Sequence, residues 1–484
     1  MGDGEVSKSI ETRLFIHGEF VESSDGKTFD LISSQNNDLL VKVSEASEED
    51  TNRAVASAKA AQPAWSALSP KHRGSYFKTL ATLIRKNNGE FARLEALSMG
   101  HPVSGYFHAQ VAASTFDYYS EAGYDIQGTT SLNNPGYLSM TYRQPYGVAA
   151  VIIPWNVPML FLAKKSAPAL IVGNCVVVKS SEKAPLTSAL LATLVKEAGF
   201  PPGVINVLSG HGHISGSVLS HHMDVRALTF TGSTRTGRLI QEASSKSNLK
   251  AISLELGGKS PAIVFEDADL DAATKGLVHS VQSNSGQTCM ASTRIYVQDT
   301  AAERFITLFK EKMEAEVRSG DPLEKETNHG PLVDVTQFEK VKRYIDIGKH
   351  DGTIILGASP RTPSTGHFIP PTIFTHTPES SLIMKEEVFG PIVNINTFTL
   401  ESEAITKSND SEYGLYASVY TKNIDRAMRV SRALEAGTVA VNCTSPYTSV
   451  DTPFGGYKGS GVGREGMPFH SMEFFLETKS VHIK

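Results

Sequence analysis

Cys289 is the residue of this sequence best placed to act as a nucleophile. It lies in QSNSGQTCMASTR, a polar segment with a glycine, between a predicted helix and the predicted strand TRIYVQ. Loops on a rigid scaffold commonly carry nucleophiles, whereas a lone cysteine is more often a buried apolar residue. Cys175 in VGNCVVV and Cys443 after VAVN have the apolar neighbours typical of packing residues. A thiol also needs a base or a positive dipole to react near neutral pH, because its free pKa is about 8.5.

Glu255 and Asn156 are the polar residues that could assist such a thiol. Glu255 follows apolar residues in SLELGGKSP and precedes a glycine pair, so it is the candidate base. The same position also suits a strand-end carboxylate that pairs with Lys259. Asn156 directly follows Pro154 and Trp155 at the end of a predicted buried strand. Its side-chain NH2 could donate to an oxyanion, although asparagine in a turn after a strand is equally common.

A second group of residues has the pattern of an anion-binding turn. The predicted strand VRALTFT at 225–231 runs into Gly232 to Gly237 and then into a predicted helix. Such a turn offers backbone N–H groups and a positive helix end to a phosphate, but it also fits an ordinary tight connection. The strand CVVVKSSE places Lys179 and Glu182 at a strand end, the side of the sheet where α/β proteins bind ligands. An acidic residue at this position can accept hydrogen bonds from ribose hydroxyls and would repel a 2′-phosphate. The alternative is that Lys179 and Glu182 belong to a solvated loop without a ligand.

Two series of alternating strands and helices must position these residues. Residues 50–125 are predicted as helices, because Ala, Leu, Lys and Glu dominate and apolar residues recur every three to four positions. β-branched runs then alternate with helices from 148 to 256, which predicts a parallel sheet. A similar series follows from 261 to 358, so we expect two α/β lobes. The Tyr- and Asn-bearing piece at 129–147 and the alternating tail at 473–484 are predicted as strands that leave the main body.

Composition and charge exclude several classes of protein. The chain has 484 residues, enough for at least two domains, and its hydrophobic fraction of 40% suits a large folded core. Its 46 Lys+Arg and 51 Asp+Glu give a net charge of -5 without basic blocks, so we expect no nucleic-acid and no membrane partner. Widely spaced cysteines exclude a disulfide framework and paired zinc ligands. From this spacing we expect no metal. The sequence shows no apolar run long enough for a membrane span and no targeting signal, so we expect a cytoplasmic protein.

Seven motifs stand in order along the chain: PWN at 154–156, VVKSSEKAP at 177–185, FTGSTRTG at 230–237, LELGGKSP at 254–261, SGQTCMA at 285–291, EEVFGPI at 386–392 and PFGGYKGSG at 453–461. Together they resemble those of the aldehyde dehydrogenase superfamily, in particular its NAD(P)-dependent, non-acylating enzymes. The resemblance implies an α/β fold with a Rossmann-like cofactor domain, an α/β catalytic domain and a small β oligomerisation element. It places the NAD-binding domain at 1–128 with 150–257, the catalytic domain at 258–465 and the oligomerisation element at 129–149 with 466–484, and it implies a homodimer or homotetramer.

The resemblance implies a role for each catalytic residue. Cys289 adds to the aldehyde carbonyl, and the thiohemiacetal passes a hydride to the nicotinamide and becomes a thioester. Glu255 activates the water that hydrolyses the thioester, and Asn156 with the backbone N–H of Cys289 forms the oxyanion hole. The implied substrate is a small-molecule aldehyde, the product is the carboxylic acid, and the cofactor is NAD.

The resemblance also implies the residues around cofactor and substrate. Glu182 favours NAD, whereas Arg235 in the phosphate turn adds positive charge and leaves NADP open. Lys164 stands where relatives commonly have an aromatic residue in the substrate tunnel. Pointing inward, Lys164 could pair with an anionic or phenolic substrate, although at least one of two adjacent helical lysines usually stays solvated. The implied cofactor residues are Ile152, Pro154, Trp155, Lys179, Ser181, Glu182, Phe230, Gly232, Ser233, Leu256, Gly257, Glu387 and Phe389, and the implied substrate residues are Val157, Phe161, Lys164, Thr288, Met290, Tyr447 and Phe454.

Three other functions would use the same fold. A cofactor-independent thiol esterase would employ Cys289, Glu255 and Asn156, and its mark would be ester cleavage without NAD+-dependent aldehyde oxidation. A CoA-acylating relative would release an acyl-CoA in place of an acid. A non-catalytic protein of this fold would be expected to lack the cysteine or the glutamate, and both are present.

Overall fold

A largely parallel sheet forms the centre of the first lobe. The computed structural model describes residues 10–358, 366–466 and 468–484. The strands of this sheet are β1 (Leu14–Ile16), β2 (Glu19–Val21), β7 (Val148–Ile152), β8 (Cys175–Lys179), β9 (Ile205–Leu208), β10 (Val225–Thr231), β11 (Ala251–Glu255) and β21 (Gly461–Val462). Their order is β2-β1-β9-β8-β7-β10-β11-β21, and the run from β9 to β11 is parallel.

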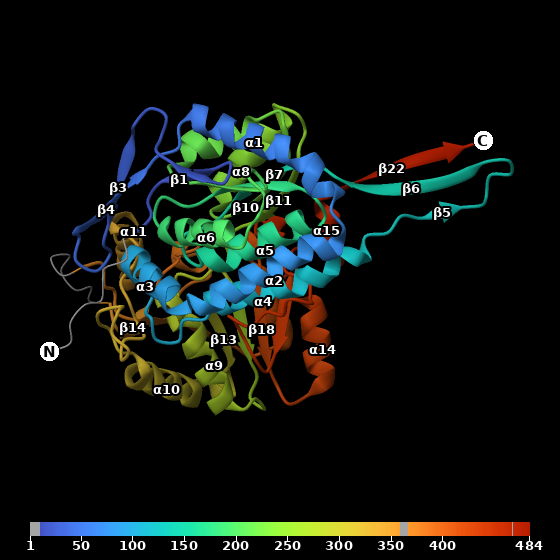
Figure 1. Ribbon diagram of the computed structural model, residues 1–484. Helices are drawn as coiled ribbons and strands as arrows, with labels where there is room; N and C mark the ends of the chain where they lie inside the picture. The colour runs from blue at the N-terminus through green and yellow to red at the C-terminus, as the bar shows by residue number, and fades with distance from the viewer. Residues whose placement is uncertain (1–9, 359–365, 467) are drawn as a thin grey trace.

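The central strands are apolar because helices cover both faces of the sheet. β7, β8 and β9 are buried along their whole length, as expected of strands inside a parallel sheet. The sequence predicted the strands of this lobe from 148 onward, and the structure confirms them. In Figure 1, α1 and α8 lie on one side of the strands and α5 and α6 on the other. The helices of this lobe are α1 (Glu48–Ala67), α2 (Pro70–Lys86), α3 (Asn88–Met99), α4 (His108–Ala122), α5 (Pro158–Ile171), α6 (Leu186–Glu197), α7 (Ser217–His221) and α8 (Thr234–Ser245).

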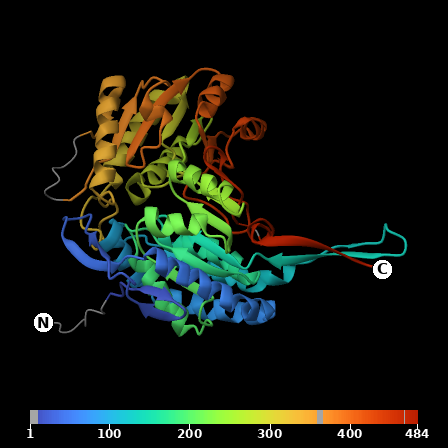
Figure 2. The ribbon, with the colours of Figure 1, turned by 90° about the horizontal axis from the view of Figure 1, so that it is seen from above.

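A second sheet, also mostly parallel, forms the other lobe. Its order is β14-β15-β16-β13-β12-β18-β19, and only the β14–β15 pair among the described strands of this sheet is antiparallel. Figure 2 shows the two lobes one above the other, with the second lobe in yellow and orange. The strands are β12 (Pro261–Val264), β13 (Arg294–Gln298), β14 (Thr353–Leu356), β15 (Thr372–Thr375), β16 (Ile392–Phe398), β18 (Tyr416–Tyr420) and β19 (Thr438–Val441). The helices are α9 (Leu270–Gln282), α10 (Asp299–Glu316), α11 (Val335–Asp351), α12 (Leu382–Lys385), α13 (Glu401–Asn409) and α14 (Ile424–Ala433).

A small antiparallel sheet projects from the main body as an arm (Figures 1 and 2). It consists of β5 (Thr130–Ser131), β6 (Leu138–Pro145) and β22 (Leu476–Ile483), in the order β22-β6-β5. The strands predicted for 129–147 are therefore confirmed. The prediction for the tail was partly wrong, because α15 (Pro468–Phe474) occupies its first residues and buries Met472 against the first lobe.

Two short antiparallel pairs complete the described strands. β3 (Thr28–Ile32) pairs with β4 (Leu39–Ser44), and β17 (Tyr413–Gly414) pairs with β20 (Tyr457–Lys458). None of the helices in the described part of the chain has the length and apolar character needed to cross a membrane.

The topology brings the carboxyl ends of several strands to one edge of the first sheet. β7, β8, β10 and β11 are parallel neighbours, so the residues that follow them emerge on the same side. The strand order reverses between β7 and β10, which is the usual position of a ligand crevice in such sheets. β21 then pairs with β11 through Glu255↔Gly461, so a segment from the end of the chain lies beside this edge.

Candidate active site

Cys289 is held by a loop with an unusual backbone. Asn284 and Ser285 have φ values of 51° and 54°, a left-handed conformation that non-glycine residues seldom adopt. Ser285 Oγ donates to the carbonyl of Gly330 at 2.8 Å, and Asn284 Nδ2 donates to the carbonyl of Asn156 at 3.1 Å. These side-chain bonds stabilise the strained turn, and the thiol is presented from a fixed backbone.

Asn156 is joined to the thiol loop by its own side chain. It is buried, and its Nδ2 donates to the carbonyl of Gln287 at 3.0 Å. Since a primary amide has two N–H groups, one remains for another acceptor. Asn156 and the loop of Cys289 thus lie together, as the sequence predicted for a pair of oxyanion donors.

The glycine pair after β11 allows close approach to both the thiol loop and Glu387. A Cβ at Gly258 would lie 2.2 Å from the backbone oxygen of Cys289, and one at Gly257 would lie 2.7 Å from a carboxylate oxygen of Glu387. The Gly258 N–H donates to Glu387 Oε1 at 2.9 Å. Only glycine fits such contacts, so this turn brings Cys289 and Glu387 to the end of the strand that carries Glu255.

The thiol of Cys289 lies in surroundings that favour its neutral form. Burial raises its pKa well above the ordinary value, and the negative charges of Glu255 and Glu387 act in the same direction. The backbone N–H groups of Cys289 and Met290 lower it. The thiol therefore needs a proton acceptor or a bound positive charge before it can react as a thiolate.

Glu255 is a buried carboxyl with a raised pKa. Its Oε2 accepts a hydrogen bond from Thr231 Oγ1 at 3.2 Å, and its buried Oε1 has no hydrogen-bond partner among the described residues. Burial, with the neighbouring charge of Glu465, raises the pKa of Glu255 to about 8. The alternative pairing with Lys259 is wrong, because the buried Lys259 Nζ also has no hydrogen-bond partner in the described part of the protein.

Glu465 and Lys165 form the surroundings of Glu255 that sequence reasoning missed. The negative charge of Glu465 acts on Glu255, and Lys165 Nζ pairs with Glu465 Oε1 and donates to Thr229 Oγ1 at 2.9 Å. Lys165 is 1% exposed within a largely buried helix. A lysine at a buried helical position needs a carboxylate partner, and this requirement was the signal available in the sequence.

The predicted cofactor residues at the end of β8 lie at the edge of the sheet. Lys179 is buried, its Nζ donates to the carbonyl of Ser180 at 2.7 Å, and burial lowers its pKa. Ser181 is buried and Glu182 is half-buried, and their side chains are within hydrogen-bonding distance at 3.4 Å. The alkyl chain of Lys179 lies beside Gly216, where an added Cβ would be 3.7 Å from it.

The Gly232 turn opens α8 as the sequence predicted. Ser233 is the N-cap, and its side chain accepts from the Thr236 N–H. A Cβ at Gly232 would lie 2.4 Å from the ring of Phe230, so the chain must be glycine there. The turn thus follows β10 directly, the Gly232 N–H donates to the carbonyl of Glu255 at 3.1 Å, and Leu256 packs against α8 at Gly237.

Trp155 and Phe389 bring two distant motifs together. Their ring centroids lie 5.4 Å apart, edge to face, and the ammonium of Lys183 lies 5.7 Å from the ring centroid of Trp155. Phe389 has a φ of 59°, and Gln337 Nε2 donates to its carbonyl at 2.8 Å. Of the remaining predicted cofactor residues, Ile152 is buried at the end of β7 and Pro154 is half-buried just after it.

The predicted substrate residues come from three segments. One group directly follows Asn156: Val157 is the N-cap of α5, and Phe161 and Lys164 lie within this helix. Their spacing places the three residues on one face of α5. Cys289 and Met290 pack against a cluster that includes Phe454. Thr288 Oγ1 donates to the carbonyl of Ser283 at 3.3 Å, and Tyr447 is 68% exposed and accepts at its backbone from Tyr416.

The other two cysteines have different surroundings. Cys175 is buried, which confirms it as a packing residue, and burial raises its pKa to about 12. The prediction for Cys443 was wrong, because its side chain is exposed. β19 has ended at Val441, and Asn442 with a φ of 56° turns the chain outward.

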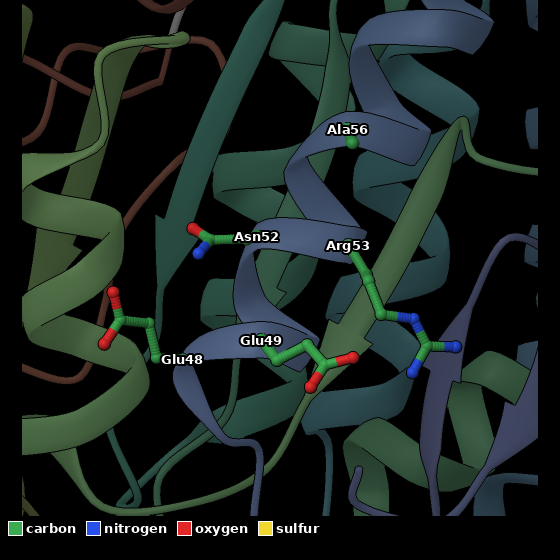
Figure 3. A pocket seen from close by; sticks show the side chains of 5 residues that line it. All are labelled: Glu48, Glu49, Asn52, Arg53 and Ala56. Carbon is green, nitrogen blue, oxygen red and sulfur yellow. The ribbon is translucent and has the colours of Figure 1, made fainter.

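Among the described residues, no group of three or more His, Cys, Asp or Glu side chains lies close enough to hold a metal ion. A separate open hollow lies at the start of α1 (Figure 3). Glu48 and Asn52 point to one side there, and Glu49 and Arg53 point to the other, so they do not converge on a common ligand.

Comparisons with known proteins agree with the motifs. The model of the aldehyde dehydrogenase family matches residues 20–481. A curated aldehyde dehydrogenase of Davidiella tassiana is 43% identical over 475 residues, which cover 98% of this chain and 95% of that protein. Aldehyde dehydrogenase 1 of Tanacetum cinerariifolium is 42% identical over 480 residues, covering 97% and 94% of the two chains. Among solved structures, a mutant of the P. syringae indole-3-acetaldehyde dehydrogenase AldA in complex with NAD+ and IAA matches with a TM-score of 0.95 and 39% identity, covering 99% of this chain and 97% of that one.

Proposed function

Because this chain belongs to the aldehyde dehydrogenase family, we propose that it oxidises an aldehyde to the carboxylic acid through a covalent adduct on Cys289. One observation carries this proposal. The backbone oxygen of Cys289 abuts Gly258 at the end of the strand that bears Glu255, while Asn156 Nδ2 bonds the loop of Cys289. A nucleophile, a base and an oxyanion donor thus lie around one point, which is the arrangement that acyl chemistry requires.

In the first step, the sulfur of Cys289 forms a bond to the aldehyde carbon. The thiol proton leaves to a base, and Glu255 in its ionised form is the base that the fold places nearby. The carbonyl oxygen gains negative charge, and the second N–H of Asn156 Nδ2 with the N–H of Cys289 stabilises it. Loss of one such donor typically costs about 10²- to 10³-fold in rate.

The cofactor of the proposed reaction is NAD. The residues at this edge of the sheet fit it, because Lys179 and Glu182 follow the end of β8 and the Gly232 turn opens α8, whose N-terminus suits a phosphate. Trp155 and Phe389 offer aromatic surface at the thiol end, and the half-buried Glu387 offers a carboxylate for ribose hydroxyls. Bound NAD+ supplies the hydride acceptor that converts the thiohemiacetal to the thioester. Arg235 is exposed at the turn and keeps use of NADP open.

In the last step, Glu255 takes a proton from a water molecule that attacks the thioester. A base with a pKa of about 8 is well matched to this task, because it accepts a proton readily once ionised near neutral pH. Glu465 and Lys165 are positioning residues that act on this pKa through their charges, in addition to the burial of Glu255. The carboxylic acid then leaves and the thiol is restored.

The domain bounds and the oligomer belong to the same proposal. The cofactor domain would comprise 1–128 and 150–257, the catalytic domain 258–465, and the oligomerisation element 129–149 with 466–484. The arm supports self-association, since Leu132, directly after β5, is 82% exposed and Tyr142 on β6 is 47% exposed. Such surfaces are normally covered by a second copy, which gives a homodimer or homotetramer.

Steady-state and rapid-quench assays of three variants test the function. C289A should lose NADH formation with every aldehyde, and E255Q should keep a first burst of NADH but release acid slowly. C443S is the matched control, since its thiol is exposed, and should keep normal turnover. NADH formation by C289A at the normal rate would overturn the proposal. Ester cleavage without aldehyde oxidation would favour the esterase, and a requirement for CoA would favour the acylating reaction.

A further inference from the structure

Lys164 occupies a defined place beside the thiol site. It lies on α5, two turns after Asn156, and its side chain is only half-buried. The ammonium lies 5.6 Å from the ring centroid of Phe454, a distance typical of a cation–π contact. Phe454 belongs to the small cluster against which Cys289 and Met290 pack. The positive charge therefore lies near the thiol and does not extend freely into solvent.

The two adjacent lysines of α5 have different partners. Lys165 is buried, and its ammonium forms an ion pair with Glu465 and a hydrogen bond to Thr229, so its charge is already neutralised within the protein. Lys164 has no carboxylate within ion-pair distance in the described ranges 10–358, 366–466 and 468–484. Asp451, on the loop before Phe454, instead accepts a hydrogen bond from Ser449.

The backbone explains why the lysines separate. Phe454 and Glu465 exchange both backbone hydrogen bonds, at 2.6 and 2.7 Å, as an isolated antiparallel bridge. Lys164 lies over the first residue of this bridge and Lys165 contacts the second. One bridge thus directs one lysine toward the base and the other toward the apolar cluster at the thiol.

We propose that Lys164 recognises an anionic aldehyde, one that carries a carboxylate at the end remote from the aldehyde carbon. A half-buried ammonium without a protein carboxylate offers a strong site for such a group, and Phe454 supplies an apolar surface for the carbon chain between the two ends. The proposal rests on the oxidation proposed above and adds its substrate class. Lys164 also lowers the pKa of Glu255, which places its charge within electrostatic reach of the base.

Matched substrate pairs test the proposal. Each dicarboxylic semialdehyde is compared with the alkanal of equal length: succinic semialdehyde with butanal, glutaric with pentanal and adipic with hexanal. For each pair we take the ratio of kcat/KM, anionic over neutral, with NAD+. K164M keeps the length of the side chain and removes its charge, and the ratio should fall about 10- to 100-fold for the best-fitting pair. K164R keeps the charge and should retain most of the ratio.

The ratio removes the indirect effect of the substitution. K164M also deletes a charge that acts on Glu255, so both substrates of a pair lose rate by a common factor that cancels. K422M, a lysine-to-methionine change at an exposed loop position, should leave the ratio unchanged. Raising KCl from about 0.05 M to about 0.5 M should lower the ratio of the wild-type protein and not that of K164M.

The outcomes separate the two proposals. If the wild-type protein oxidises the alkanals and K164M has the same ratio as the wild type for every pair, the role of Lys164 is overturned and the oxidation stands. A different result would be that K164M lowers kcat/KM for a hydroxybenzaldehyde relative to the neutral aldehydes but leaves the ratio of every semialdehyde pair unchanged. The anionic carboxylate class is then overturned in favour of phenols. If no aldehyde yields NADH, the oxidation itself fails.

Discussion

The carboxyl groups of Glu255 and Glu465 lie near one another, and one oxygen of each, Glu255 Oε1 and Glu465 Oε2, is buried without a hydrogen-bond partner among the described residues. The negative charge of Glu465 disfavours a second negative charge beside it and so raises the pKa of Glu255. Lys165 partly compensates this effect, because its ammonium pairs with Glu465 and lowers the pKa of Glu255. Burial and two residues distant in sequence, Glu465 and Lys165, therefore together determine the pKa of Glu255.

E465Q should move the pH profile of turnover. Removing the negative charge of Glu465 makes ionisation of Glu255 easier, so its pKa should fall from about 8 by roughly one unit. The base is active when ionised, and the rise of kcat with pH should shift to lower pH by the same amount. The measurement is kcat against pH for a substrate whose thioester hydrolysis limits turnover. E412Q, an exposed glutamate on the second lobe, is the control, and an unmoved profile in E465Q would contradict this role for Glu465.

The thiol of Cys289 should react slowly with iodoacetamide in the absence of cofactor. Its pKa lies well above the ordinary value, so at pH 7 the thiolate fraction is small and alkylation should be at least about 10-fold slower than for a free thiol. C443S serves as background, because the exposed Cys443 would otherwise be labelled first. Mass spectrometry of the Cys289 peptide follows the rate.

The E255Q substitution in the C443S background distinguishes two effects of Glu255 on Cys289: repulsion of the thiolate by its negative charge, and abstraction of the thiol proton. The negative charge of Glu255 raises the pKa of Cys289, so neutralising it should speed alkylation at pH 9, where Glu255 is largely ionised. Slower alkylation of E255Q would instead show that Glu255 acts as the base for the thiol in the free protein. Turnover by E255Q should fall in either case.

Acid should destabilise the protein through His101. Burial lowers the pKa of His101 to about 3 in the folded state, against about 6.5 when unfolded, with the charge of nearby His108 acting in the same direction. Below pH 6.5 the unfolded state binds the extra proton, so stability falls as pH decreases toward 3. Between pH 6.5 and pH 5 the loss should be about 2 kcal/mol.

H101Q should remove this part of the pH dependence. Its unfolding midpoint in urea should change less between pH 7.5 and pH 5 than that of the wild type, even if its stability at pH 7.5 is lower. H350Q, at a histidine exposed on α11, is the control and should keep the wild-type dependence. An equal pH dependence in H101Q and the wild type would rule out His101 as the source.

Removing the last strand should abolish self-association. β22 pairs with β6 along its whole length, from Leu476↔Pro145 to Ile483↔Leu138, so a chain ending at Phe475 leaves the arm without this strand. Light scattering after size-exclusion chromatography should show a dimer or tetramer for the full chain and a monomer for the truncated one. Y142E, which places a charge on the exposed face of the arm, tests the same surface with all strands retained. A monomeric full chain would refute the oligomer.

Local sequence patterns predicted the elements but not every neighbour in the site. Continuous apolar runs such as CVVVK predicted the parallel strands, since only strands covered on both faces read this way. Glu255 and Cys289 stand in motifs that could be recognised one at a time. Glu465 and Lys165 could not be paired, because a backbone bridge at Phe454 brings them together across 300 positions.

The errors also have physical causes. Cys443 follows an apolar strand in the sequence, but the left-handed conformation of Asn442 changes the direction of the chain just before it. No residue type marks such a turn reliably. The tail is predicted as a strand from Glu473 onward, yet burial of the preceding Met472 against the first lobe favours a helix at its start over an extended chain. In both cases contacts distant in sequence decide against the local pattern.

Ser460 connects the proposed site to the last part of the chain. Its backbone oxygen accepts from Leu256, and its hydroxyl donates to the carbonyl of Gly257 at 2.6 Å, so it secures the turn between Glu255 and the thiol loop. Ser460, β21 and Glu465 all come from the last part of the chain, after every other residue of the proposed chemistry has been synthesised. A nascent chain that has reached Cys289 still lacks Ser460 and Glu465. The proposed site is therefore complete only after this C-terminal segment has paired with β11.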